Sequence, residues 1–342
     1  MDWMPPADWP RITTVDAHAE GEPLRVILSG LPPIPGDTIL AKRRYARENL
    51  DGLRRTLMFE PRGHADMYGC ILTEPVTPDG DMGVLFLHNE GFSTMCGHGI
   101  IGLVTVVYET GLVAATGDSP VLRLDTPAGR VTAQAEWDAA AGRVRSVSFE
   151  NVPSFVYTLD RNVEVEGIGR VRYDVAFGGA FYAYCDAADL GVGVTPDDFR
   201  RLIDVGMRVK RAVMASLPLR HPFEEDLGFL YGTIIVGPPE GEGADSRNVC
   251  IFADGEVDRS PTGTGVSGRV ALAHARGQLP VGQPFVIESL IGTRFTGRVV
   301  RETQYGPFAA VVPEVTGRAW ITGRHEFLIA PDDPLREGFI LR

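Results

Sequence analysis

The sequence predicts an α/β (α+β) protein made of two pseudo-symmetric, sheet-rich lobes, each of which wraps one central helix. Two observations lead to this prediction. A glycine-rich stretch occurs once in each half of the chain, and short β-type runs separated by Gly/Pro turns fill most of the remainder. We expect a cleft between the lobes, with the first turns of both helices facing it.

The two copies of the repeat are CGHGIIGLVTVVYETG, which starts at Cys96, and TGTGVSGRVALAHARG, which starts at Thr262. Their alignment gives five identities, four of which are glycines, and Gly97 meets Gly263. A predicted strand precedes each copy, at 82–90 and 246–258, and a glycine suited to a helix C-terminus ends each copy. The shared order of strand, polar loop and helix predicts two copies of one structural unit.

The remaining elements follow from local patterns. Short strands are predicted by RVILSGLPPIPG, VLRLDTPAGRVTAQAEW, RVRSVSFENVPSFVY, YGTIIVGPPEG and FVIESLIGTRFTGRVV. Two Arg-rich segments, 41–55 and 200–213, have the periodicity of amphipathic helices with solvated charged faces. We place the first lobe at 1–152, the second at 153–325, and a C-terminal tail at 326–342 that packs back on the first lobe.

Composition restricts the class of protein. A formal net charge of −12 on 342 residues disfavours nucleic acid or an anionic membrane as the main partner, because both attract clustered positive charge. The longest apolar run, 100–108, is too short to span a bilayer, and no secretion pattern opens the chain, so we expect a cytoplasmic protein. Only Lys42 and Lys210 are available for a Schiff base, and the four cysteines lack C-x-x-C spacing, which disfavours pyridoxal phosphate, zinc and disulfides.

The stretch around Cys96 has three interpretations. GHGIIG satisfies the G-x-G-x-x-G pattern of dinucleotide-binding loops, but about seven residues separate it from the preceding strand, which argues against that fold. In the second interpretation Cys96 is a buried, inert small residue. In the third, the thiol lies at a helix N-terminus, where the macrodipole and unpaired amide groups lower its pKa and stabilise the thiolate.

Two opposed helix starts also predict an anion site. We expect one carboxylate to be held by the amides of four residues, namely Gly97, His98, Gly263 and Thr264. Cys96 then faces one side of the bound molecule and Thr262 the other. This arrangement suits removal of a proton next to a carboxylate, with no cofactor and no metal.

Four motifs carry a resemblance to a known family: MCGHGIIG (95–102), DRSPTGTGVSGR (258–269), GGAFYA (178–183) and EPRGHADMYG (60–69). They resemble the proline racemase family, which includes proline racemases, hydroxyproline 2-epimerases and trans-3-hydroxy-L-proline dehydratases. The likeness runs from VDAHAEGEPLRV to WITGRHEFLIAPDDP. It implies a diaminopimelate-epimerase-like fold with the active site in the cleft between the lobes, a cofactor-independent enzyme, a small imino-acid substrate and a homodimer.

The sequence departs from the racemases of that family at one position. Racemases and epimerases carry cysteine at both helix starts, whereas this chain has Cys96 at the first and Thr262 at the second. Inversion needs a proton carrier on each face of the substrate, and a threonine hydroxyl is too weak an acid or base for that role. We therefore expect Thr262 to act mainly as a helix N-cap, and a single sulfur to face the substrate.

A cysteine paired with a threonine resembles the dehydratase branch. In trans-3-hydroxy-L-proline the α-hydrogen and the 3-hydroxyl share one face of the ring, so a single group can take the proton and return it to the departing hydroxide. The hypothesis is that Cys96 does both, with syn loss of the hydroxyl, to give Δ1-pyrroline-2-carboxylate. The alternatives are racemase or 2-epimerase activity with a second base other than a thiol, and an imino-acid-binding protein without turnover.

Further residues carry weaker expectations. The resemblance implies that Asp258 meets the ring ammonium of the substrate. His221 falls near a family histidine that reaches the substrate, although a loop histidine without a role explains it equally well. The imidazole of His98 has no assigned role. Two pairs of residues keep two interpretations each. His64 and Asp66 either serve the cleft or brace it, and Glu90 and Glu256, one in each half, either orient the helix starts or are solvated.

Overall fold

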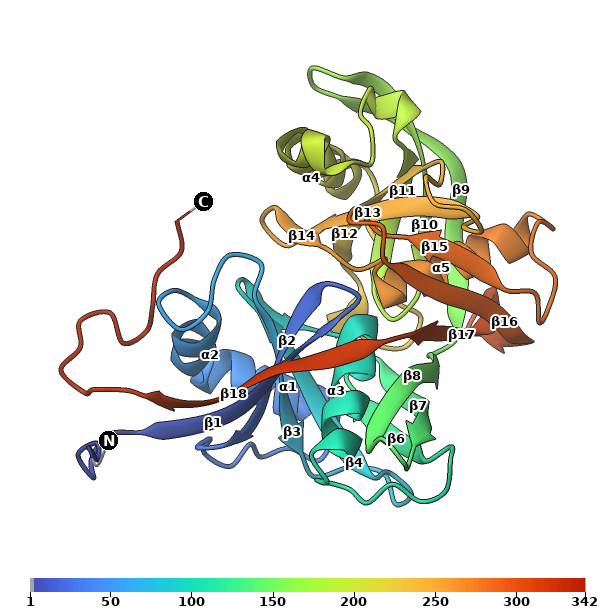
Figure 1. The fold of residues 1–342 in the computed structure, drawn as a ribbon. Coiled ribbons are helices and arrows are strands. Elements are labelled where there is room, and N and C mark those ends of the chain that lie inside the picture. The colour runs from blue at the N-terminus through green and yellow to red at the C-terminus, as the bar shows by residue number, and fades with distance from the viewer. Residues whose placement is uncertain (1–2, 342) are drawn as a thin grey trace.

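The computed structural model describes residues 3–341, which form two lobes that lie against each other (Figure 1). Each lobe curves its sheet around one helix, α3 (Gly97–Glu109) in the first lobe and α5 (Gly263–Ala275) in the second. These are the two helices that the repeat predicts. Among the described residues, no helix is both long enough and apolar enough to cross a membrane.

The first lobe is formed mainly by the N-terminal half of the chain. Helix α3 is buried along almost its whole length, because its sequence is apolar on every side. Two further helices, α1 (Ile39–Asn49) and α2 (Asp51–Met58), lie outside the sheet (Figure 1). Its strands are β1 (Arg11–Ala19), β2 (Glu22–Ser29), β3 (Tyr68–Thr73), β4 (Met82–His88), β5 (Gly91–Ser93), β6 (Val121–Thr126), β7 (Gly129–Asp138) and β8 (Arg143–Glu150).

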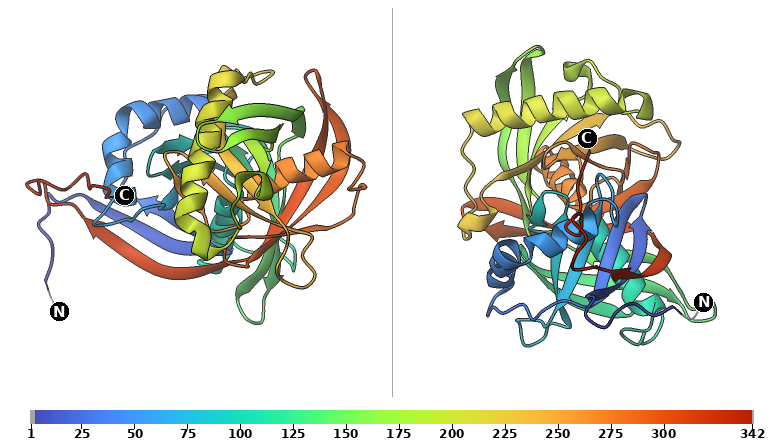
Figure 2. Two further views of the ribbon diagram at one scale, coloured as in Figure 1. Left: turned by 90° about the horizontal axis from the view of Figure 1, so that it is seen from above. Right: turned by 90° about the vertical axis from the view of Figure 1, so that its left-hand side faces the viewer.

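The second lobe repeats this plan around α5. One long helix, α4 (Phe199–Ser216), covers its outer side (Figure 2), and three short 3-10 helices lie at Ala188–Leu190, Pro196–Asp198 and Glu225–Leu227. Its strands are β9 (Ser154–Val165), β10 (Gly169–Phe177), β11 (Phe181–Asp186), β12 (Leu230–Gly237), β13 (Ser246–Phe252), β14 (Glu256–Asp258), β15 (Phe285–Glu288), β16 (Arg294–Tyr305) and β17 (Phe308–Gly317).

Strand pairing shows that the lobes are copies of one design. The antiparallel pair β1–β2 corresponds to β10–β11, the parallel pair β2–β3 to β11–β12, and the hairpin β4–β5 to β13–β14. In both lobes a parallel pairing, β4–β6 or β13–β15, follows the central helix. In the first copy the predicted polar loop contains the short strand β5, and in the second copy the single strand predicted over 246–258 is divided into β13 and β14.

The chain returns to the first lobe at its C-terminal end. Strand β18 (Ala319–Leu328) pairs antiparallel with β1 along its whole length, and the two strands run side by side in Figures 1 and 2. A bridge between Glu60 and Phe339 ties the tail to the same lobe. The predicted lobe boundary at 325 therefore differs from the structure, in which the second lobe ends near Gly317 because the next strand belongs to the first sheet.

The helix starts meet at two glycines. A Cβ atom on Gly97 would lie 2.5 Å from the Cα of Gly263, and one on Gly263 would lie 2.6 Å from the Cα of Gly97. Real Cβ atoms do not approach other atoms this closely, so only glycine fits at both positions. The glycines in the first turn of each helix thus allow two backbones to touch.

We predict that Gly263→Ala destabilises the protein by about 1–3 kcal/mol, because the new methyl group forces the two helix starts apart. The measurement is urea unfolding followed by circular dichroism.

Gly52→Ala in α2 is the matched control. Its added Cβ would lie 3.5 Å from the Glu337 side chain, an ordinary contact. We expect this variant to be neutral or more stable by up to about 1 kcal/mol from helix propensity. Equal stability of the Gly263 variant and the unaltered protein would contradict the steric argument.

Candidate active site

Residues from both lobes surround a small cavity of about 10 Å³, little more than the space of one water molecule, at the junction of the helix starts. It is lined by Tyr68, Met95, Cys96, Gly97, His98, Tyr182, Tyr231, Cys250, Phe252, Asp258, Thr262, Gly263 and Thr264. Seven of the eight predicted site residues are among them, and the exception is His221.

Cys96 occupies the N-cap position of α3. Its backbone is extended, with φ −147° and ψ 110°, and its Sγ accepts a hydrogen bond from the Gly99 amide at 3.2 Å. The pKa of the thiol is nonetheless higher than predicted from this position. Burial raises that pKa well above the ordinary value and the Asp258 carboxylate adds to the rise, whereas hydrogen bonds from Gly99 and Tyr68 lower it. For the Cys96 thiol, desolvation therefore outweighs the effect of the helix terminus.

His98 lies directly beside the thiol. Its Nδ1 is 3.2 Å from the Cys96 Sγ, and its ring packs edge-on against Tyr68 with centroids 4.7 Å apart. Burial lowers the pKa of His98 to about 3, so the imidazole is neutral at pH 7. A neutral ring can exchange hydrogen bonds with the sulfur without adding charge to the cavity.

Thr262 does not cap helix α5 with its side chain, contrary to the sequence prediction. It occupies the N-cap position, but no amide of the first turn donates to its hydroxyl. Its φ of +66° is a strained conformation for a β-branched residue, and its buried Oγ1 has no hydrogen-bond partner within bonding geometry. The hydroxyl instead lies near enough to Asp258 and Cys250 to lower the pKa of both groups.

A second sulfur, Cys250, also lines the cavity, which corrects the prediction of a single one. It lies on β13 directly opposite Asp258 of β14, on the side of Thr262. Burial raises the pKa of this thiol well above its ordinary value, and Asp258 raises it further. Cys250 belongs to a strand and has no helix N-terminus to stabilise a thiolate, which distinguishes it from Cys96.

Asp258 ends β14 at the cavity wall. Its Oδ1 accepts hydrogen bonds from the backbone amide of Ser260 at 2.8 Å and from the Ser260 hydroxyl at 2.7 Å. Burial raises the pKa of Asp258 to about 6, against the opposing effect of these hydrogen bonds. The group is thus an ionised carboxylate at pH 7 that lacks a fully balancing cation.

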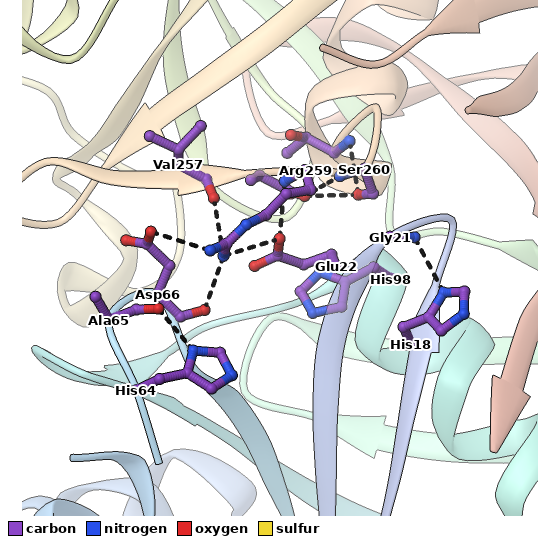
Figure 3. A network of polar contacts seen from close by, with 12 residues as sticks. His18, Gly21, Glu22, His64, Ala65, Asp66, His98, Val257, Arg259 and Ser260 are labelled. Atoms are coloured by element: carbon purple, nitrogen blue, oxygen red, sulfur yellow. Dashed lines mark hydrogen bonds and ion pairs between the residues drawn. The ribbon is translucent and has the colours of Figure 1, made fainter. Parts of the chain in front are cut away.

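Arg259 joins the lobes beside this carboxylate (Figure 3). Its backbone amide donates to Glu22 Oε2 at 2.8 Å, and its guanidinium lies 3.2 Å from both the carboxylate and the backbone carbonyl of Asp66. Asp66 therefore braces the cleft, whereas the nearby His64 ring contacts the carbonyl of its own neighbour Ala65. Burial raises the pKa of Glu22 well above its usual range, and Asp258 contributes to the rise.

Basic side chains of the outer helices hold the hairpins that precede both helix starts. Arg43 of α1 donates to the Phe92 carbonyl from two nitrogens, at 2.9 and 2.6 Å, and Lys210 of α4 donates to the Ala253 carbonyl at 2.6 Å. Most arginines of the two Arg-rich runs are exposed, as predicted for solvated charged faces. Arg43 and Lys210 are buried exceptions, because carbonyl groups at the ends of hairpins need donors.

Three other residues lie outside the cavity lining. His221 packs on Phe177 and accepts from the Glu224 amide at 3.0 Å through its Nδ1, so it stabilises its own loop. Glu90 and Glu256 hold equivalent positions in the two halves of the sequence, but their surroundings differ. Glu90 is exposed, whereas Glu256 is buried 3.3 Å from the His88 ring of the other lobe.

The sequence interpretation missed the aromatic wall of the cavity. Tyr68, Tyr182 and Tyr231 come from three different strands, and only the fold brings them together. Tyr182 Oη lies 2.6 Å from the Thr264 hydroxyl, which ties it to the helix start. Tyr68 belongs to the motif EPRGHADMYG and Tyr182 to the motif GGAFYA. Membership of these motifs was the only sequence signal for the aromatic wall. Among the described residues, no group of three or more His, Cys, Asp or Glu side chains is placed to hold a metal ion.

Comparisons with known proteins show what the chain is similar to. A family model described as proline racemase matches residues 14–340. Two curated relatives named trans-3-hydroxy-L-proline dehydratase are 47% identical over 331 residues (Colwellia psychrerythraea, 97% of this chain and 93% of the relative) and 48% identical over 329 residues (Bacillus thuringiensis, 96% and 98%). A crystal structure of a hydroxyproline epimerase from Agrobacterium vitis, with bound trans-4-hydroxy-L-proline, superposes with a TM-score of 0.92 at 32% identity, covering 98% of this chain and 96% of that one. This likeness confirms the predicted fold class.

Proposed function

The chain belongs to the proline racemase family, and from this premise we propose that it dehydrates trans-3-hydroxy-L-proline to Δ1-pyrroline-2-carboxylate without a cofactor. One observation carries the proposal. Of the two helix starts that meet in the cavity, one presents the sulfur of Cys96, held by the Gly99 amide, and the other presents the hydroxyl of Thr262. The names of the two relatives at 47% and 48% identity support the same activity.

The substrate is bound by opposite charges at its two ends. Its carboxylate lies between the helix starts, where the amides of Gly97, His98, Gly263 and Thr264 and both helix dipoles favour an anion. Its ring ammonium pairs with Asp258. These two contacts place the α-carbon between Cys96 and Thr262.

The chemistry needs one proton carrier. The Cys96 thiolate takes the α-proton, so that the Cα–H bond breaks and an S–H bond forms. The Cα–C3 double bond then forms as the C3–O bond breaks, and the thiol proton passes to the departing oxygen to give water and a thiolate. The resulting enamine tautomerises to the cyclic imine, and no electrons are gained or lost.

Substrate binding itself favours the thiolate. In the unliganded cavity, Asp258 is one of the groups that raise the pKa of Cys96. A ring ammonium beside Asp258 cancels that negative charge, while the Gly99 amide continues to donate to the sulfur. The ring ammonium therefore lowers the pKa of Cys96 and favours the thiolate, while the substrate carboxylate, whose charge acts in the opposite direction, is neutralised by the helix amides.

A second candidate activity, 2-epimerisation, is favoured by the presence of Cys250 in the cavity lining and by the epimerase of similar fold. It requires Cys250, or the Thr262 hydroxyl, to deliver a proton to the opposite face. Cys250 has no amide donor comparable to Gly99 and lies next to the Asp258 carboxylate, which disfavours its thiolate. Elimination of water needs neither Cys250 nor the Thr262 hydroxyl as a proton donor.

The proposal is tested with three imino acids. The protein is incubated with trans-3-hydroxy-L-proline, trans-4-hydroxy-L-proline and L-proline, and o-aminobenzaldehyde detects the cyclic imine. We expect colour with the 3-hydroxy compound alone. Absence of imine together with an inverted α-centre would replace the dehydratase assignment by an epimerase. Binding of pyrrole-2-carboxylate without any turnover would leave only an imino-acid-binding protein.

We predict that Cys96→Ser and Cys250→Ser have unequal effects. The first removes the base and should lower kcat for imine formation by about 10³-fold or more, whereas the second should lower it by less than about tenfold. Both are buried thiol-to-hydroxyl changes, so each controls for the other. Equal losses, or retention of activity by the Cys96 variant, would contradict the assignment of a single sulfur base.

The raised pKa of Asp258 predicts a pH dependence. Above about pH 6 the free enzyme carries the carboxylate that attracts the ring ammonium, and below it the group is protonated and neutral. We expect kcat/KM to fall about tenfold more per pH unit below 6 than above it, on top of the fall caused by protonation of the Cys96 thiolate, because this parameter reports the free enzyme. Asp258→Asn should remove this acidic limb and lower kcat/KM by about 10²-fold at pH 8. A profile that falls no more steeply below pH 6 than above it would exclude Asp258 as the ammonium partner.

A further inference from the structure

A cluster of three hydroxyl groups lies on the Cys96 side of the cavity. Tyr68 Oη is 2.5 Å from Ser93 Oγ and 3.4 Å from Tyr231 Oη, and all three side chains are buried. On the opposite side, the Tyr182 hydroxyl is already committed to Thr264. The two faces of the bound ring therefore meet different polar surroundings.

Tyr68 is the member of this cluster nearest to the chemistry. Its ring lies against that of His98, which is itself 3.2 Å from the Cys96 sulfur. A hydrogen bond from its hydroxyl lowers the pKa of Cys96. The Tyr68 hydroxyl and the sulfur thus face the same small space.

The number of hydrogen-bond donors in the cluster leaves the Tyr68 O–H free to point into the space next to the Cys96 sulfur. A tyrosine hydroxyl has one O–H donor and two acceptor lone pairs. When Ser93 and Tyr231 both donate to Tyr68, its lone pairs are filled and its own O–H points away from them. The remaining neighbour in that direction is the Cys96 sulfur or a substrate atom next to it.

We propose that the Tyr68 hydroxyl donates a hydrogen bond to the 3-hydroxyl of the substrate and holds this oxygen beside Cys96 Sγ while the C3–O bond breaks. The inference rests on the proposed dehydratase function and adds the residue that recognises the leaving group. Burial and the neighbouring sulfur raise the pKa of Tyr68 well above its usual value, so the phenol keeps its proton. The proton that completes the water molecule is still the one from Cys96.

The test uses Tyr68→Phe in the full-length protein, with ordinary and α-deuterated trans-3-hydroxy-L-proline as substrates. We expect kcat to fall about 10²-fold, the usual effect of losing one donor to a developing negative charge. Because C3–O cleavage becomes the slow step, the α-deuterium isotope effect on kcat should fall toward unity. The affinity for pyrrole-2-carboxylate, which has no 3-hydroxyl, should change by less than about threefold.

A change in kcat of less than about threefold would overturn the inference, since buried tyrosines outside the site tolerate such a substitution. A large fall in kcat with an unchanged or larger isotope effect would also overturn it, because the hydroxyl would then act on the thiol alone. Tyr173→Phe on β10 is the control for loss of a buried phenol away from the cavity. It should leave kcat and the isotope effect as they are.

If the Tyr68→Phe variant does not bind pyrrole-2-carboxylate, the Ser93→Ala variant is measured in its place. This variant keeps the phenol but removes a group that directs its proton, so a lower kcat with a smaller isotope effect supports the role of Tyr68. No change in either quantity overturns it. If the unaltered protein forms no imine from the 3-hydroxy substrate, the proposed function fails as well, whereas a normal enzyme with a fully active Tyr68 variant removes only this inference.

Discussion

Two helix N-termini touch through the backbones of Gly97 and Gly263, and the rest of the site depends on this contact. The arrangement is electrostatically unfavourable by itself, because the positive ends of two macrodipoles face each other. The paired strands β8 and β17 hold the lobes together, and Arg259 adds a polar link from one lobe to Glu22 and Asp66 of the other. A fold that forces two such helix ends together creates a strong preference for an anion between them.

Acidic side chains lie around this contact and place negative charge next to the positive helix ends. Glu22 and Asp258 lie close to the helix ends and carry raised pKa values, and both raise the pKa of the Cys96 thiol. A zwitterion neutralises both groups of charges, because its carboxylate faces the positive helix ends and its ammonium faces the acidic side chains. A simple carboxylic acid neutralises only the helix ends. Under the proposed function, the cavity would therefore select its ligand by charge pattern before any contact with the ring.

The sequence was sufficient for features that repeat and insufficient for features that depend on assembly. The glycine-rich copies predicted α3, α5 and the meeting of Cys96 with Thr262, because glycine spacing and flanking strands are local patterns. The sequence shows that residue 250 is a cysteine, but it does not show that this residue lines the cavity. Only the pairing of β13 with β14 brings Cys250 opposite Asp258.

Burial explains the other differences from prediction. The thiol pKa was predicted from a helix terminus alone, whereas desolvation by both lobes dominates it. Thr262 belongs to a residue type common at N-caps, yet its positive φ directs the hydroxyl elsewhere. Within the mostly solvated Arg-rich segments, the sequence could not reveal that Arg43 and Lys210 are buried, because their carbonyl partners lie in distant hairpins.

The return of β18 to β1 has a consequence for the order of folding. Residues 154–317 form a continuous segment that contains every strand and helix of the second lobe, so this lobe can be completed as soon as the ribosome has released it. The first lobe, although synthesised earlier, must wait with an open edge at β1 until β18 emerges. The lobe that carries Cys96 is therefore the last to mature, and it spends the longest time exposed to chaperones and to mispairing.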